Sequence, residues 1–300
     1  MVFRYLIFIV FIKTSHIGEN MTQNTNPLVD FYRNPKLYVA LPSGAGHYSE
    51  DIIEMTEVGE LPVYPMTAKD DILTKNPDAL LNGDAVIKLV KSCVPAVKNP
   101  AELLAPDMEV LLIAIRQASS NDEFMEVNRD CPNCNEPNRF DLDLSVALAE
   151  SQEIEPFKTI TLSNGLDVVL TPTNYLHTIQ SAKAVIEQNR QFRSIQADNS
   201  DEQLKALGDA LEKLSLMNYE VILNSIKSIA IPGGDTVTEI EHISEFLNNV
   251  EKEIGMELNE HVSEINNGGI QKEIEMQCSE CSHVYKTPIN YDPVGFFLNS

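Results

Sequence analysis

The sequence predicts an α+β protein that is mostly helical. It combines a small β-rich N-terminal part, a helical bundle, and a zinc ribbon split by a long helical insertion. Three observations predict this class. Two CxxC pairs, CPNC and CSEC, lie far apart in the chain. The segment between them carries apolar residues mainly at helical spacing. The segment before the first pair has short strand-like runs broken by Gly and Pro, followed by capped helices.

Each CxxC pair stands between two strand-like runs, as a zinc knuckle does. FMEVNRD enters the first pair and NRFDLDL leaves it, while EIEMQ enters the second pair and HVYKTP leaves it. Four thiolates from two such knuckles form a closed tetrahedral site that suits zinc. We therefore predict one structural zinc per chain, with the ligands Cys131, Cys134, Cys278 and Cys281.

The distance between the pairs is unusual, because residues 135–277 intervene where a ribbon usually has roughly 15–20 residues. About three extra doublings of the loop cost roughly 1.8 kcal/mol, whereas structural zinc contributes on the order of 10–16 kcal/mol. The insertion therefore does not exclude the site. Redox motifs, disulfides, two unrelated reduced pairs, and His283 in place of one thiolate are the alternatives. Cys93, in the apolar run AVIKLVKSCV, is expected to be a buried core residue.

Composition and charge limit the partners. The chain has 300 residues, enough for one or two domains, and a net charge of −23, which argues against nucleic acid and anionic membranes and favours a basic protein partner. Residues 1–20 contain the apolar run VFRYLIFIVFI, which is shorter than the roughly 20 residues of a membrane span. We expect this segment to be a spurious leader or a weak signal-like segment, with Met21 as the true start.

Residues 21–125 are predicted to form a mixed α/β domain. The part from 35 to 65 is β-rich, with turns at Gly and Pro. Gly44 and Gly46 do not form a phosphate loop, because no helix opens directly behind them and no Lys-Ser/Thr follows.

Residues 67–120 of this domain are predicted to be helical. Thr67 and Asp70 suit a variant capping box at the first helix. Pro77 suits the first turn of the second helix. Further helices are expected over residues 84–94, which have apolar residues at helical spacing, and from Pro106, where a nearly continuous apolar run predicts the central helix.

Residues 126–172 are predicted to hold the first knuckle and a β-hairpin with Asn164-Gly165 in its turn. Asp141 and Asp143 alternate along the strand after the knuckle. A paired-carboxylate site is one interpretation, and we prefer a solvated strand face.

Residues 173–266 are predicted to be a helical insertion, capped at Thr173 or Asn174. After a polar break, apolar residues recur at helical spacing at Leu204, Leu207, Leu211, Leu214, Val221, Ile222, Ile226 and Ile229. The leucines fit a coiled coil with another subunit, which would make a homo-oligomer, or a long helix packed on its own neighbours, which we prefer. Helices over 235–248 and 252–265 complete the insertion.

Residues 267–300 are predicted to hold the second knuckle and a C-terminal tail. The tail places Phe296, Phe297 and Leu298 near the chain end. Apolar residues there are expected to dock, either on a partner or, as we prefer, back onto the domain.

No catalytic constellation is present in the sequence. It contains no GxSxG, P-loop or HExxH motif, and its six His residues are scattered. A zinc ion held by four thiolates has no open position for water or substrate. We therefore predict no catalytic and no cofactor-binding residues, and a protein that is not an enzyme.

The order of several segments resembles a known family. PKLYVALPS is followed by VGELPVYPMTAKDDILTKNPDALLNGDAVIKLVKSCV and ELLAPDMEVLLIAIRQAS, and then by the two knuckles, which are separated by a block containing IEHISEFLNNV. From about residue 30 onward, this order resembles the baseplate hub proteins of T-even-like contractile-tailed bacteriophages.

The resemblance implies a non-enzymatic structural or assembly role in the baseplate hub. It implies other hub and tail proteins as partners in the host cytoplasm during assembly, with the chain either a subunit of the virion tail or an assembly factor, while the net charge argues against nucleic acid and membrane partners. The alternative is a zinc-ribbon adaptor that binds nucleic acid or a polymerase, which would need a basic surface near the knuckles. These segments carry only scattered basic residues among several acids, at Arg129, Lys272 and Lys286.

Overall fold

The computed structural model describes residues 26–120, 124–194, 200–289, 291 and 293–298. The chain divides into two units, residues 1–33 and residues 34–300. The predicted leader at 1–20 and Met21 lie outside the described residues. The described part of the first unit is a short 3-10 turn, η1 (Val29–Phe31), with Leu28, Val29, Phe31 and Tyr32 exposed around it.

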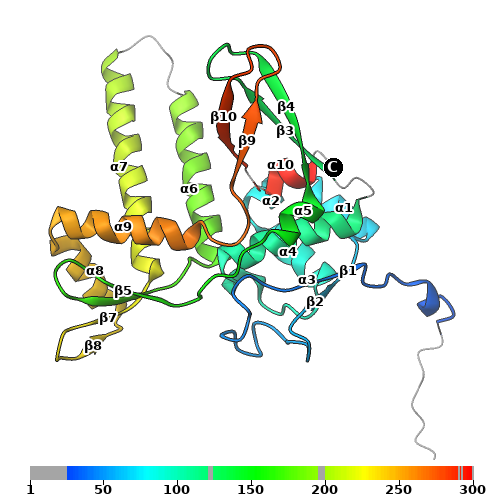
Figure 1. The fold of residues 1–300 in the computed structure, drawn as a ribbon, viewed down its shortest axis with the longest axis horizontal. Helices are drawn as coiled ribbons and strands as arrows, with labels where there is room; N and C mark the ends of the chain where they lie inside the picture. The colour runs from blue at the N-terminus through cyan, green and yellow to red at the C-terminus, as the bar shows by residue number, and fades with distance from the viewer. Residues whose placement is uncertain (1–25, 121–123, 195–199, 290, 292, 299–300) are drawn as a thin grey trace, which may run out of the picture. The chain divides into compact units, whose positions relative to one another are not determined.

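The second unit begins with the predicted mixed α/β segment (Figure 1). The capping box at Thr67 is confirmed, because Asp70 N donates to Thr67 Oγ1 at 3.2 Å and Thr67 N donates to Asp70 Oδ2 at 2.8 Å. The elements are β1 (Leu37–Val39), antiparallel β2 (Leu61–Val63), α1 (Ala68–Thr74), α2 (Pro77–Leu81), α3 (Asp84–Cys93), η2 (Pro100–Glu102) and α4 (Ala105–Ser119). The middle of α4 is fully buried, which confirms the expectation that this helix is central.

Two hairpins carry the CxxC pairs. β3 (Phe124–Asp130) pairs with β4 (Pro137–Asp143), and β9 (Glu273–Gln277) pairs with β10 (Val284–Pro288), both antiparallel. A short helix that we did not predict, α5 (Leu144–Ala149), follows β4. Asp143 caps it by accepting hydrogen bonds from the backbone N–H groups of Ser145 and Val146. Asp141 is exposed and pairs with Arg139, in agreement with a solvated strand face.

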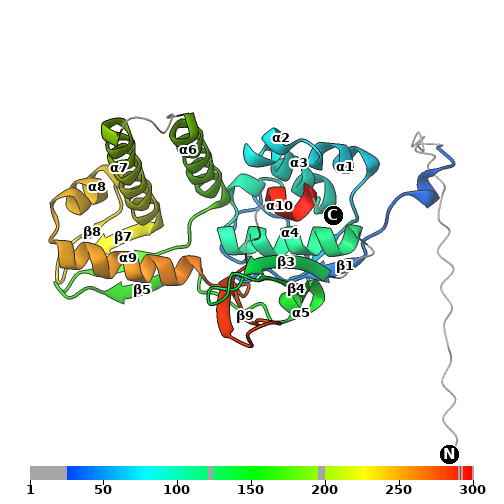
Figure 2. The same cartoon turned by 90° about the horizontal axis from the view of Figure 1, so that it is seen from above.

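The insertion is not helical throughout, which corrects the sequence-based prediction. α6 (Tyr175–Ser194) and α7 (Ser200–Ser225) lie side by side, and α8 (Ile240–Asn249) and α9 (Lys252–Asn266) follow (Figures 1 and 2). Between α7 and α8 the chain forms β7 (Ile226–Ala230) and β8 (Thr236–Val237). These strands extend the predicted hairpin, β5 (Lys158–Thr161) and β6 (Asp167–Leu170), into an antiparallel sheet of order β5-β6-β7-β8.

The error at β7 has a physical reason. The segment IKSIA is short and contains two β-branched Ile residues, so its apolar spacing fits a helix as well as a strand. Pairing with β6, where Ile229 stands opposite Val168, buries Ile229 to 5% exposure. The same strands leave residues 235–239 outside α8, whereas we expected a helix from 235.

Two separate hydrophobic cores stabilise the second unit. The first core contains the N-terminal elements, the inner faces of both hairpins and the C-terminal helix α10 (Pro293–Leu298). Phe296 and Phe297 are 1% and 3% exposed there, so the tail docks on its own chain as we preferred. The second core lies among the sheet, the C-terminal end of α7, α8 and α9. Across the described residues, no helix combines the length and apolarity that a bilayer crossing requires.

Candidate metal centre

The tips of the two hairpins bring the four cysteines together. Cys131 follows β3 and Cys278 follows β9, so each pair begins where its incoming strand ends. All four Sγ atoms lie within 4.8 Å of one another. The Cys131–Cys281 sulfurs are 3.7 Å apart, and the Cys134–Cys278 sulfurs are 3.6 Å apart. Segments separated by the whole insertion therefore meet at one point.

These distances distinguish a metal site from a disulfide. A disulfide requires about 2.05 Å between sulfurs. Four sulfurs at about 2.3 Å from a tetrahedral ion stand about 3.8 Å apart, close to the two distances in this cluster. The cluster could therefore hold a metal ion with a closed set of four soft ligands, leaving no position for a substrate.

The two knuckle turns are built in the same way. In the first turn, Asn135 N donates to Cys131 O and Cys131 N donates to Glu136 O; in the second, Ser282 N donates to Cys278 O and Cys278 N donates to His283 O. Asn135 and Ser282 occupy equivalent places with φ of 59° and 57°. This left-handed conformation closes a tight turn, so that both cysteines of a pair face the same side.

Two asparagines of the first hairpin contact sulfurs of the second. Asn138 Nδ2 lies 3.6 Å from Cys278 Sγ, and its Oδ1 accepts from Ser279 N at 3.0 Å. Asn133 Nδ2 lies 3.6 Å from Cys281 Sγ. Amide N–H groups that donate to a thiolate stabilise its negative charge and fix its position. We did not predict these residues, and their only signal in the sequence is the repeated Asn of CPNCNEPN.

The thiols of the cluster differ in acidity. The pKa of Cys278 is lowered to about 6, mainly by the backbone N–H of Cys281. The pKa of Cys281 is also lowered, mainly by its hydrogen bond from Asn133. The pKa of Cys134 is raised to about 12: the backbone N–H of Glu136 favours its thiolate, but desolvation and contacts with the other three cysteines outweigh that effect. A bound dication would remove this conflict among like charges.

The hairpins are held in register by burial on one face. Met125 and Val127 of β3 and Ile274 and Met276 of β9 are at most 8% exposed and belong to the first core. The outward residues of these strands are mostly exposed. The cysteine cluster therefore stands at the end of a packed support.

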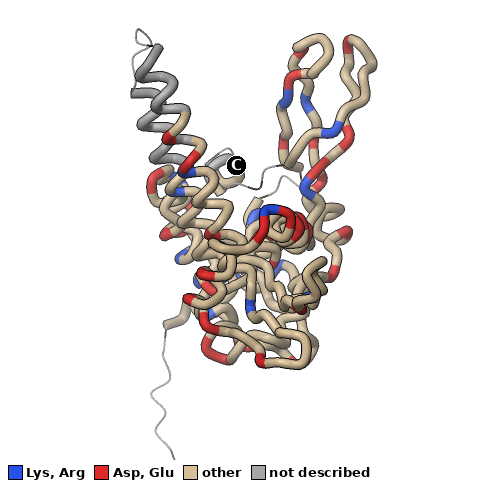
Figure 3. The backbone as a smooth tube through the Cα atoms, turned by 90° about the vertical axis from the view of Figure 1, so that its left-hand side faces the viewer, with Lys and Arg blue, Asp and Glu red and all other residues tan. Residues whose placement is uncertain are grey.

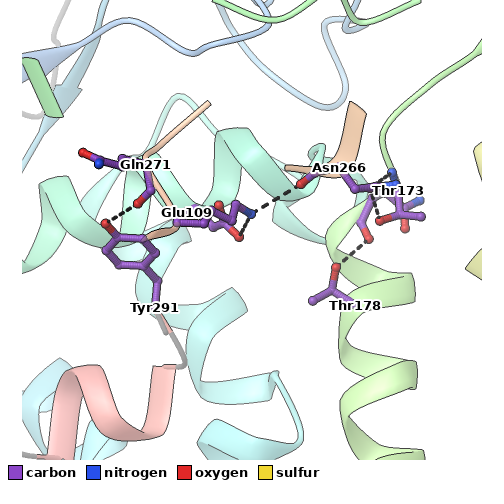
Figure 4. Close-up of polar contacts among 8 residues, drawn as sticks. Glu109, Thr173, Thr178, Asn266, Gln271 and Tyr291 are labelled. Carbon is purple, nitrogen blue, oxygen red and sulfur yellow. Dashed lines mark hydrogen bonds and ion pairs between the residues drawn. The ribbon is translucent and has the colours of Figure 1, made fainter. Parts of the chain in front are cut away.

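Ion pairing and hydrogen bonds anchor the root of the second hairpin. Lys272 Nζ lies 2.7 Å from Glu109 Oε1 of α4, and Tyr291 Oη donates to Gln271 O at 3.0 Å (Figure 4). Nearby, Asn266 at the end of α9 accepts hydrogen bonds from both Thr173 N and Thr173 Oγ1 at 2.9 Å. These contacts join the end of the insertion to the segment that opens α6.

The other candidate residues lie elsewhere. His283 stacks on Tyr285 with ring centroids 6.1 Å apart and is not a member of the cluster. Cys93 is fully buried in α3, as expected. The surroundings of the cluster are acidic, and Figure 3 shows acidic positions along both hairpins. Over residues 124–143 and 273–288, eight acidic residues accompany three basic ones: Glu126, Asp130, Glu136, Asp141, Asp143, Glu273, Glu275 and Glu280 against Arg129, Arg139 and Lys286.

A family model described as T4 bacteriophage base plate protein matches residues 53–298. The match covers more than half of the chain and includes both hairpins and all four cysteines. No curated protein matches the chain significantly. No solved structure matches it significantly either.

Proposed function

The chain belongs to the T4 bacteriophage base plate protein family, and from this premise we propose that it builds the baseplate hub. In this proposal it is a structural or assembly protein without enzymatic activity. It acts through contacts with other hub and tail proteins, first in the host cytoplasm and then in the virion tail. The ordered segments that resemble hub proteins support the hub over other parts of the baseplate.

The second part of the proposal is that one structural zinc ion joins the two hairpins. The convergence of the four cysteines supports it. The two sulfur–sulfur distances of 3.6 and 3.7 Å suit tetrahedral thiolate ligation. Zinc is the ion that a closed set of four thiolates favours. The ion would join the two ends of the insertion, so that the second core is held on the first at its root.

The charge of the chain indicates the kind of partner. With a net charge of −23 and acidic hairpins, the surface suits a basic protein partner and repels nucleic acid. The adaptor interpretation required a basic surface beside the knuckles. The charges along these strands favour the hub interpretation instead.

Localisation in phage particles tests the hub assignment. Antibodies against the chain would be applied to purified tails and to tail precursors from infected cells, and their positions recorded by electron microscopy. We expect label at the centre of the baseplate, or the protein bound to hub precursors if it acts only during assembly. Label at the baseplate periphery, or absence from every tail precursor, would refute the hub role.

A further inference from the structure

A groove runs along one side of β1 in the second unit. It has a volume of about 620 Å³, and its lining includes every residue from 37 to 44. The facing wall is formed by α5 and by the segment 151–154 that follows it, and α5 lies beside β1 in Figures 1 and 2. Ile154 N donates to Pro42 O at 2.9 Å, so the two walls are joined there. We call this space the β1 groove.

The β1 groove is bordered by the edge of the strand and not by one of its faces. Side chains of successive residues in a strand point to opposite faces. Leu37 and Val39 pack against the first core, whereas Tyr38 and Ala40 are exposed, yet all four residues line the groove. Residues of both faces border one space where the strand presents its edge. Among the described residues, β2 is the one strand that pairs with β1, so this second edge of β1 is open.

Backbone groups along the open edge have no partner. Tyr38 stands opposite Pro62 in the β1–β2 register, and a proline has no N–H to donate to the Tyr38 carbonyl. Outside the β1–β2 ladder, the described residues make no backbone hydrogen bond to Tyr38 or Ala40. Residues 37–41 carry neither a charge nor a proline, the features that commonly keep an open edge from pairing with another strand.

The lining of the β1 groove indicates the kind of strand that fits. A strand added to β1 would place every second side chain on the core side of the sheet, as Leu37 and Val39 are placed. Leu148 and Ile154 give the facing wall apolar surface, so these positions suit apolar residues. Among the described residues that line the groove, Glu153 alone is charged. A basic residue between the apolar positions therefore complements the groove.

A second copy of this chain fits the groove less well than a basic partner does. Pairing of two β1 strands, edge to edge, would bring together two groove walls that each carry Glu153. Each copy also has a net charge of −23, and like charges at close range repel. A small molecule would pair with few of the backbone groups, whereas a strand meets them at regular spacing.

We propose that the open edge of β1 accepts an extended segment of another protein as a third strand. This segment has apolar residues at alternate positions and lysine or arginine between them. The inference rests on the proposed function and deepens it, because the segment would belong to another baseplate protein and the groove specifies its chemistry.

Fluorescence anisotropy with the purified full chain tests the proposal. The probe is a labelled synthetic peptide of about nine residues, in which valine alternates with threonine and lysine. We expect saturable binding that weakens as salt is added. Methylation of the peptide nitrogens at alternate residues removes the N–H groups along one edge of the peptide. One methylated set should bind at least about tenfold more weakly, because its N–H groups face β1, and the complementary set should bind like the parent peptide.

Two glutamates of the chain provide a matched pair of variants. Glu153→Gln should weaken peptide binding by about two- to fivefold at low ionic strength. Glu155→Gln removes an exposed glutamate that does not line the groove, and it should bind the peptide like the parent chain. Circular dichroism melting should show that both variants remain folded.

Four results would overturn the proposal. The peptide fails to bind saturably, both methylated sets lose affinity equally, Glu155→Gln is weakened as much as Glu153→Gln, or sedimentation velocity shows self-association of the chain that the peptide reverses. The last result would assign the groove to a second copy. All four are obtained with the purified chain, whereas the hub assignment is tested on phage particles, so the two failures are distinguishable.

Discussion

Replacement of Cys278 by Ser tests the central argument about the metal. Cys278 is 2% exposed and closes a loop of about 140 residues with Cys134 across the cluster. Closing a loop of that length costs about 5 kcal/mol of chain entropy. An unfolded chain must lose this entropy to bring its four thiolates to one ion, whereas the folded chain already holds them together. If zinc also binds the thiolates of the unfolded chain, a bound ion would therefore favour the folded state over the unfolded state by up to about 5 kcal/mol.

We expect Cys278→Ser to lose bound zinc and about 3–5 kcal/mol of unfolding free energy, since three ligands no longer hold the ion tightly. For a chain of this size, that is a fall in Tm of about 10 °C. Metal content would be measured by mass spectrometry and stability by urea and thermal unfolding. The parent should contain about one zinc per chain and, after treatment with a chelator, should unfold like the variant.

Cys93→Ala provides the control, because Cys93 is a fully buried cysteine outside the cluster. It should cost about 1–2 kcal/mol through the cavity that it leaves, and it should retain both the zinc and the response to chelator. The reasoning is refuted if the parent holds no metal and Cys278→Ser melts like the parent. It is also refuted if chelator destabilises Cys278→Ser as much as it destabilises the parent.

Three further predictions follow from particular contacts. Asn138→Ala should weaken zinc binding by about 10–100-fold while one zinc still binds at saturation; competition with a chromophoric chelator measures this, and equal loss in exposed Asn128→Ala would count against a specific role. Because the pKa of Cys134 is raised to about 12 in the metal-free cluster, zinc binding at neutral pH should release protons and the apparent affinity should rise with pH; a calorimetric enthalpy independent of buffer ionisation would contradict this. Asp107→Ala should lower the free energy of unfolding, measured in urea, by about 3 kcal/mol or more, since this buried carboxylate accepts hydrogen bonds from Ser43 N, Ser43 Oγ and Tyr48 Oη. The control is Asp71→Ala, which removes the exposed ion pair with Lys75 and should change this free energy by less than about 1 kcal/mol.

Local chemistry was sufficient to predict many elements. The capping box of Thr67 and Asp70 and the first-turn Pro77 mark the first two helices because their effects act within a few residues. The same holds for the turn at Asn164-Gly165 and for the knuckle strands, whose boundaries lie close to those expected. The thiolate chemistry of the two CxxC pairs also predicts one shared site.

Long-range contacts decided the remaining elements. IKSIA became a strand because β6 stood beside it with unpaired backbone groups, and its own residues fitted either a helix or a strand. The bridging role of Asn138 arises from the approach of two hairpins that are separated by the whole insertion. No short-range pattern records such an approach.

The sequence by itself determined the candidate ligands, most of the helices and their caps, and the family resemblance, because these depend on residue type and near neighbours. Only the tertiary structure decided that the four sulfurs converge, that the insertion has its own sheet and core, and that Phe296 docks on its own chain while Leu211 remains exposed. The physical reason is that burial and convergence are properties of segments far apart in the chain. Their free energy is set by the elements that come to lie beside them in space.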